Sequence, residues 1–268
     1  TIDCKKTRRS YGMAFTMWSF GHFIFIISPF LIWLILYVGF KEKSFEEKRR
    51  IGVFISILGV LILMLRNIEI FINKNFLFHY EIIPLQICHF ANFVLLYAFL
   101  KNHKTMFAFA WLFNLPAAYM SIIFANGLEN YDSLLTLRGI GYIAGHMLIV
   151  GLTFWSFSSG FVLLNKKILV KLFSILIPLY LLAHMVNNLF SILIDSNSNY
   201  FYTMRPEAGT PLELFFSLGK TYQIGLFVIN PIYLFLTAIF GFIIILIIYL
   251  LSYKIQSPKS INNFSNVM

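Results

Sequence analysis

The chain has 268 residues, of which 59% are hydrophobic and 12% charged, and its formal net charge is +10. A soluble domain is nearer half apolar and a quarter charged, so this composition excludes an ordinary soluble globular protein. In a soluble protein the positive charge would suggest nucleic-acid binding. Here most Lys and Arg residues fall in short loops between apolar blocks, where they set membrane topology, and we expect no nucleic-acid partner.

Seven apolar segments, each near the roughly 20 residues that cross a bilayer, predict seven transmembrane helices. We expect an all-α polytopic membrane protein with one seven-helix bundle over residues 18–253. A basic N-terminal tail, 1–17, precedes the bundle, and a C-terminal tail, 254–268, follows it. The predicted helices cover residues 18–40, 51–73, 83–100, 105–126, 139–164, 168–194 and 224–253.

Two parts of this pattern are irregular. The fourth segment is interrupted by Asn114 and Pro116, and the loop 195–223 is much longer than the other connections. Within that loop the stretch PLELFFSL is too short to span a membrane, so we expect it to lie on the surface or to dip in as a short amphipathic helix. No internal repeat is evident, which gives no support to an inverted-repeat transporter.

The distribution of basic residues predicts the orientation in the cell membrane. The face with the C-terminal tail carries 12 Lys and Arg residues, and the opposite face carries 8, of which four lie in the N-terminal tail. The positive-inside rule then favours an external N-terminus and a cytoplasmic C-terminus, although the basic N-terminal tail acts in the other direction.

The polar residues of the predicted helices share one depth, in the half of the bilayer nearer the N-terminal face. A charged side chain at the bilayer centre costs about 2.5–3.5 kcal/mol on insertion scales, so such residues face a bundle interior or a wet cavity. Their common depth predicts one cavity, which opens towards the outer leaflet in the orientation above. These residues are His22, Arg66, Glu69, Cys88, His89, His146, His184, Asn187, Asn188, Gln223 and Asn230.

Each of these groups also has a purely structural interpretation. Arg66 and Glu69 are spaced i,i+3 and could form an ion pair along one helix face. Asn187 and Asn188 could supply hydrogen bonds between helices. His22 alone could be a packed, hydrogen-bonded histidine. The coincidence of depth favours a shared site over these separate roles.

Cys88 is the candidate nucleophile, although a lone cysteine is often only a small buried hydrophobe. A cysteine attacks as its thiolate, and a histidine can serve as the base that takes its proton. His89 is adjacent in sequence and points about 100° away on a helix, so it is poorly aimed at the thiol. We expect His89, like His103, to have a solvated or interfacial role. His146 has a similar depth on another helix and is the better base.

Other polar groups of this set are candidates for contacts with a substrate. Arg66, Asn187 or Asn188 could stabilise an oxyanion or hold a lipid phosphate. His22, Glu69 and His184 complete the candidate group for oxyanion or head-group binding. Pro84 places Cys88 near a helix N-terminus, whose partial positive charge favours a thiolate. No CxxC, HExxH or GxxxxGK[ST] pattern occurs, and we expect no metal and no cofactor.

Five stretches in order carry a resemblance to a known family. They are FTMWSFGHFIFI around His22, IPLQIC ending at Cys88, YIAGHMLIVG around His146, HMVNN at 184–188, and NSNYFYTMRPEAGTPLELF after it. The chain resembles the YwaF-like bacterial integral membrane proteins, the family that includes the eukaryotic transmembrane protein 164. This sequence departs from the pattern where Ile83 stands before the proline and where His89 follows the cysteine.

The resemblance implies a seven-helix fold related to the androgen-induced gene 1 hydrolases. It also implies acyl transfer through a cysteine thioester with a histidine partner, which by position are Cys88 and His146. The leading hypothesis is a membrane-embedded lipid acyltransferase or lipid hydrolase that acts on a membrane phospholipid or lyso-lipid.

Two other classes remain. One is a non-catalytic membrane subunit or lipid-binding scaffold of a larger complex, in which a resident lipid would fill the cavity or Cys88 would pack away from His146. The other is a solute transporter, which the one-sided polar cluster disfavours because a transport path needs polar groups across the whole depth.

Overall fold

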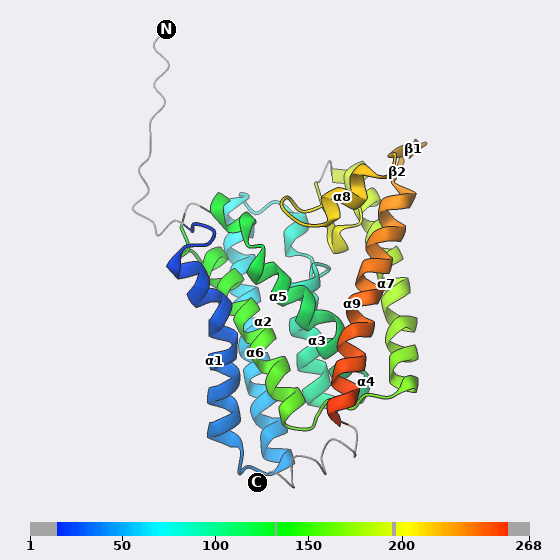
Figure 1. Cartoon of the computed structure of the whole chain (residues 1–268). Helices are drawn as coiled ribbons and strands as arrows, with labels where there is room; N and C mark the ends of the chain where they lie inside the picture. Colours follow the sequence, from blue (N-terminus) through cyan, green and yellow to red (C-terminus); the bar gives the residue numbers. More distant parts are fainter. Residues whose placement is uncertain (1–14, 132, 195–196, 257–268) are drawn as a thin grey trace.

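The computed structural model describes residues 15–131, 133–194 and 197–256, and within them it confirms the seven predicted spans. The described residues form one bundle, with two spans broken into shorter pieces (Figure 1). The unbroken spans are α1 (Phe20–Phe40), α2 (Phe45–Asn73), α6 (Leu137–Ser158), α7 (Lys166–Ile194) and α9 (Pro231–Gln256). Residues 1–14 and 257–268 of the two expected tails lie outside the described residues.

The third span consists of a 3₁₀ turn, η1 (Tyr80–Ile82), and α3 (Ile87–Lys101). The sequence predicted that this helix starts at Pro84, but the helix begins three residues later. The residue before a proline avoids the helical region, so Ile83 is extended and the chain turns before α3 starts. Cys88 is therefore the second residue of α3, closer to its N-terminus than expected.

The fourth span is divided where Asn114 and Pro116 were expected to interrupt it. It runs through α4 (Lys104–Phe109), a π-helical segment η2 (Ala110–Asn114) and α5 (Leu115–Ile123). Pro116 lies in the first turn of α5, where its missing N–H costs no intrahelical bond. Single π turns inside helices are frequent at functional sites, and α5 forms one wall of the cavity described below.

Local capping explains where two helices differ from their predicted bounds. α2 starts at Phe45 instead of residue 51, because Ser44 and Glu47 form a reciprocal capping box that supports a charged first turn. α6 ends at Ser158 instead of 164, because Gly160 adopts a positive φ of 79° just after the last turn.

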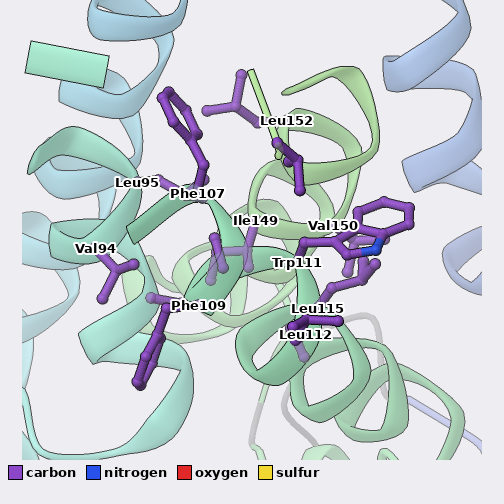
Figure 2. Close-up of a cluster of buried hydrophobic side chains, with 14 of the residues drawn as sticks. Val94, Leu95, Phe107, Phe109, Trp111, Leu112, Leu115, Ile149, Val150 and Leu152 are labelled. Atoms are coloured by element: carbon purple, nitrogen blue, oxygen red, sulfur yellow. The ribbon is translucent and has the colours of Figure 1, made fainter. Parts of the chain in front are cut away.

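α6 lies at the centre of the bundle, where it packs against α1, α2, α3 and α5. Side chains from α3, α4, η2 and α6 interdigitate in the core between these helices (Figure 2). Two glycines permit close approach at these contacts. A Cβ on Gly151 would lie 2.8 Å from Ile32 of α1, and a Cβ on Gly52 of α2 would lie 2.3 Å from the Phe99 ring.

α7 and α9 lie at the side of this core that is remote from α1 (Figure 1). α7 packs mainly on α4, and α9 packs on η2 and on the short helix α8 (Leu212–Ser217). A hydrogen bond of 2.8 Å from Trp111 Nε1 to Ser252 Oγ fixes the lower part of α9. Higher up, α9 presents many exposed apolar side chains, as a lipid-facing helix does.

The long loop is folded over the end of the bundle that holds the start of α1 (Figure 1). It contains the turn η4 (Tyr200–Tyr202), α8, and an antiparallel hairpin of β1 (Tyr222–Ile224) and β2 (Phe227–Ile229). PLELFFSL thus contains a short helix, as expected. The last span starts at Pro231 instead of residue 224, because Gly225 turns the chain with a φ of 63° and Asn230 caps the helix.

Candidate functional site

A cavity of about 950 Å³ lies between α2, α3, α5, α6, α7 and α9 and beneath residues 197–212. Its lining combines titratable groups near the start of α3 with an apolar wall from α7 and α9. Cys88, His146 and Arg66 are three of the lining residues that the sequence singled out. Together with His89, these are the members of the predicted set of eleven polar residues that line the cavity, and the other seven do not.

Cys88 and His146 line the same cavity, and the two side chains are close enough to interact electrostatically. His146 Nδ1 also lies 2.6 Å from the main-chain oxygen of Tyr142. A carbonyl oxygen only accepts hydrogen bonds, so Nδ1 carries the proton and Nε2 of the neutral ring is left as the acceptor. The bond to Tyr142 O thus fixes which nitrogen of His146 can accept a proton.

Three further groups surround the sulfur, and the sequence interpretation missed them. Ser121 Oγ of α5 lies 3.7 Å from Cys88 Sγ, and Tyr142 donates a hydrogen bond of 2.8 Å to the Ser121 carbonyl. Tyr202, in the loop, contacts the Ser121 hydroxyl. Neutral hydroxyls carry no charge cost in a membrane, and the depth argument used charged, imidazole, amide and thiol groups, so it did not select these three residues.

His89 occupies a different position from the one expected. It was predicted to be solvated or interfacial, but it is only 9% exposed and lines the cavity. Its Nδ1 is buried and has no hydrogen-bond partner among the described residues. The reason is that four consecutive residues, 86–89, line the cavity, so the first turn of α3 is enclosed on more than one side. His89 points about 100° away from Cys88 around the helix axis, but its side chain still faces the cavity.

The ion pair considered between Arg66 and Glu69 is absent from the described residues, and each side chain has another partner. Arg66 binds Glu81 of η1, with 2.7 Å between Nη2 and Oε2. Glu69 accepts a hydrogen bond of 2.5 Å from the main-chain nitrogen of Arg138, at the start of α6. The free N–H groups at the N-terminus of α6 attract the Glu69 carboxylate. Arg66 is instead paired with the Glu81 carboxylate, which η1 brings to it.

Glu69 is not among the residues that line the cavity, and neither are four other predicted site residues. His22 is fully buried, accepts a hydrogen bond from Trp18 N and donates one of 2.9 Å to Ile122 O. Its two nitrogens are satisfied by the main chain, as in the packed-histidine interpretation. His22 therefore holds the start of α1 against α5. The other three residues are His184, Asn187 and Asn188 of α7.

The two asparagines of α7 bind the long loop. Asn187 donates to Tyr200 O at 3.0 Å and accepts from Tyr200 N at 2.9 Å. Asn188 accepts from Val228 N at 2.7 Å and also contacts the His184 ring. The expected hydrogen-bonding role is present, but it joins a helix to a loop instead of joining two helices, and it leaves these side chains away from the cavity.

Glu81, Arg138, Arg205 and Glu207 are charged cavity residues that the sequence interpretation did not select. Burial raises the pKa of Glu207, which lies in the loop, while nearby Arg205 acts in the opposite direction. A signal was available for three of them, since Glu81 lies just before IIPLQIC and Arg205 and Glu207 belong to the block YTMRPEAGTP. All four lie outside the predicted helices, where the depth argument does not apply.

The comparisons with known proteins give one positive finding. No curated protein and no solved structure matches the chain significantly. The model of the TMEM164 family matches residues 15–251, which include all seven spans up to the last turns of α9. This match confirms the resemblance inferred from the five stretches, and the chain is a multi-pass membrane protein that belongs to the TMEM164 family.

Proposed function

We propose that the protein is a lipid-modifying enzyme in which Cys88 is the nucleophile and His146 is the base. The observation that carries the proposal is the proximity of the thiol to an imidazole whose Nδ1 is bound to Tyr142 O. The pair lies in a cavity inside a membrane bundle, where an acyl ester of a lipid is the reactive group at hand. A nucleophile, a base and an orienting contact on that base form the general arrangement for covalent catalysis.

The reaction proceeds in two halves. The Cys88 sulfur attacks the ester carbonyl carbon while its proton passes to His146 Nε2. The carbon–oxygen bond to the glycerol then breaks, and the departing oxygen takes that proton from His146. In the second half a lyso-lipid hydroxyl or a water attacks the thioester, gives its proton to His146, and releases the acyl group as an ester or an acid. The sulfur leaves as the thiol with the proton from His146.

The tetrahedral intermediate needs a hydrogen-bond donor for its oxyanion. Asn187 and Asn188 were candidates, but their side chains bind the long loop. Arg66 remains a member of the cavity, although its guanidinium already contacts Glu81 and Asn67. His89 is the better donor, because it lines the cavity with an imidazole nitrogen that no described residue binds.

The acyl chain has an apolar path to the site. The cavity wall includes Ile177 and Leu181 of α7 and Phe235 of α9, which are 58%, 56% and 64% exposed. Side chains that face both the cavity and the lipid mark a lateral entrance between the bilayer and the site. With the N-terminus outside, as the basic residues favour, this entrance serves the outer leaflet.

The alternative is a non-catalytic subunit or lipid-binding scaffold. It expects Cys88 to pack away from His146, whereas the two side chains are close enough to interact, which favours the enzyme. The test follows an isotopically labelled acyl chain from phospholipid into other lipids or free fatty acid, with purified protein in bilayers. Cys88→Ala should abolish the transfer and Cys4→Ala should leave it intact. Acyl transfer by Cys88→Ala at the same rate as by the unmodified protein would contradict the mechanism.

A further inference from the structure

The mouth of the cavity carries more positive than negative groups. Among the described lining residues, three arginines, Arg66, Arg138 and Arg205, stand against two carboxyl groups, Glu81 and Glu207. Burial raises the pKa of Glu207 and so favours its neutral form, which weakens the negative side further. The cavity mouth therefore has a surplus of at least one positive charge.

Two of the arginines share a single carboxylate. Glu81 Oε2 lies 2.7 Å from Arg66 Nη2, and Glu81 Oε1 lies 2.9 Å from Arg138 Nη2. The Arg66 and Glu81 side chains are only 6% and 14% exposed, so this pair is desolvated and neutralises itself. Arg138 is 43% exposed and is the member whose charge has no separate counter-ion among the described residues.

Arg138 is also held in place with donor capacity left over. Its guanidinium carbon lies 4.7 Å from the centre of the Tyr131 ring, and its main-chain nitrogen is bound by Glu69. Its Nε is buried and has no hydrogen-bond partner in the part of the chain that the structure describes. An oriented guanidinium that is still 43% exposed suits a planar or tetrahedral oxyanion.

Arg205 reaches the same mouth from the loop. It donates a hydrogen bond to Asn197 O, which fixes its guanidinium beside the cavity. Arg205 and Arg138 both interact electrostatically with Tyr80, so the two charges approach the mouth from the loop and from α6. Arg138 shares Glu81 with Arg66, and Arg205 forms no ion pair within 4.0 Å among the described residues, although Glu207 is near enough to interact with it.

We propose that Arg138 and Arg205 bind the phosphate of a phospholipid, above an acyl ester that reaches Cys88. A phosphodiester carries one negative charge, which matches the surplus at the mouth, and its unesterified oxygens suit arginine N–H groups. The inference rests on the proposed function only in taking that lipid as the acyl donor. Arg66, which the sequence suggested for this role, instead holds Glu81 in position.

Binding can be measured without turnover. Full-length Cys88→Ala protein in detergent is titrated with a short-chain phosphatidylcholine, with the matched diacylglycerol that lacks the phosphate, and with inorganic phosphate. The phosphatidylcholine should bind more tightly than the diacylglycerol. Arg138→Gln should weaken phosphatidylcholine binding about tenfold or more, as expected for the loss of a charged hydrogen bond, and should leave diacylglycerol binding unchanged.

Controls separate a specific effect from a folding defect. Arg50→Gln removes a 77% exposed arginine from the opposite end of the bundle and should change none of the affinities. Arg138→Lys keeps the positive charge but loses the planar set of guanidinium N–H donors. This variant should bind phosphatidylcholine with an intermediate affinity. Arg205→Gln tests the contribution of the loop. It should also weaken the binding of phosphatidylcholine and leave the binding of diacylglycerol unchanged.

Three results would overturn the inference. One is equal binding of phosphatidylcholine and diacylglycerol, and another is unchanged phosphatidylcholine binding by both Arg138→Gln and Arg205→Gln. The third is binding of inorganic phosphate as tight as that of the lipid, which would assign the site to free phosphate. If any of these occurs while labelled acyl transfer still depends on Cys88, the proposed function stands and only the phosphate site fails.

Discussion

His146 Nδ1 lies 2.6 Å from the carbonyl oxygen of Tyr142, one turn earlier in the same helix. A carbonyl oxygen only accepts, so this contact places the ring proton on Nδ1 and leaves Nε2 as the acceptor. Because donor and acceptor both belong to α6, the orientation of the ring depends on a single helix and not on a loop. In the proposed mechanism, this contact would orient the base before a lipid enters.

His146→Ala should slow acyl transfer by about 10²–10⁴-fold, the usual contribution of a positioned general base. The rate of labelled-acyl transfer in bilayers checks this. His103→Ala is the matched control, since His103 caps α4 and lies outside the cavity lining. A His146→Ala rate within twofold of the unmodified protein would exclude His146 as the base.

His89→Ala should slow acyl transfer while Cys88 still reacts normally with a small alkylating reagent. The physical reason is that the proposed donor acts on the oxyanion, whereas alkylation forms no oxyanion, and removing one such donor costs about 10²–10³-fold. His89→Asn, which keeps a side-chain N–H, should recover part of the rate. If alkylation falls as far as acyl transfer does, His89 acts on the thiol instead.

Glu81→Gln should destabilise the fold. It leaves the 6% exposed Arg66 without a carboxylate, and breaking a buried pair from one side costs about 3–5 kcal/mol. A lower thermal midpoint in detergent is the expected readout. Glu42→Gln, at an 87% exposed carboxyl, supplies the comparison and should leave the midpoint unchanged. Equal midpoints for the two variants would show that Arg66 needs no counter-ion.

Asn187→Ala should release the loop that covers the cavity. Asn187 makes hydrogen bonds to Tyr200 N, Tyr200 O and Thr203 Oγ1, all inside buried surroundings. Losing them should speed proteolysis between residues 197 and 212, where the loop folds over the site. The exposed Gln223→Ala supplies the comparison, and identical cleavage rates in both variants would argue against this anchoring role.

Glu207 should make stability depend on pH. Burial raises its folded pKa above the ordinary 4.5, so its contribution is fully present below that value and is lost as pH rises through the raised pKa. Glu207→Gln should therefore gain thermal stability relative to the unmodified protein as pH increases above 4.5. Melting curves from pH 4 to 8 test the sign, and a gain that shrinks with rising pH would be the opposite of this expectation.

The seven spans could be predicted from the sequence because they depend on local hydrophobicity. Cys88 and His146 each lie near the start of a predicted helix that begins on the same face of the bundle, and both line one cavity in the structure. Contacts that depend on the folding of loops were not predictable in this way. Glu81 reaches Arg66 through η1, and the loop turns Asn187 and Asn188 away from the cavity.

The error over His89 has a different cause. Helical geometry correctly separates its direction from that of Cys88, but it does not say what surrounds the helix. The loop 197–212 closes over the first turn of α3, so both directions face one cavity. The packing of a loop over a distant helix leaves no periodic pattern in the sequence. The path of this loop depends on local turns, such as the one in which Phe201 and Tyr202 adopt positive φ.

The most direct test of the central claim is the mass of the peptide that contains Cys88 after incubation in phospholipid bilayers. The account predicts an acyl adduct on Cys88 that carries the labelled chain, is released by hydroxylamine, and is absent from Cys88→Ala. The adduct should accumulate when no lyso-lipid acceptor is supplied. Acyl transfer that proceeds with Cys88 unmodified at every time point, and equally in Cys88→Ala, would contradict it.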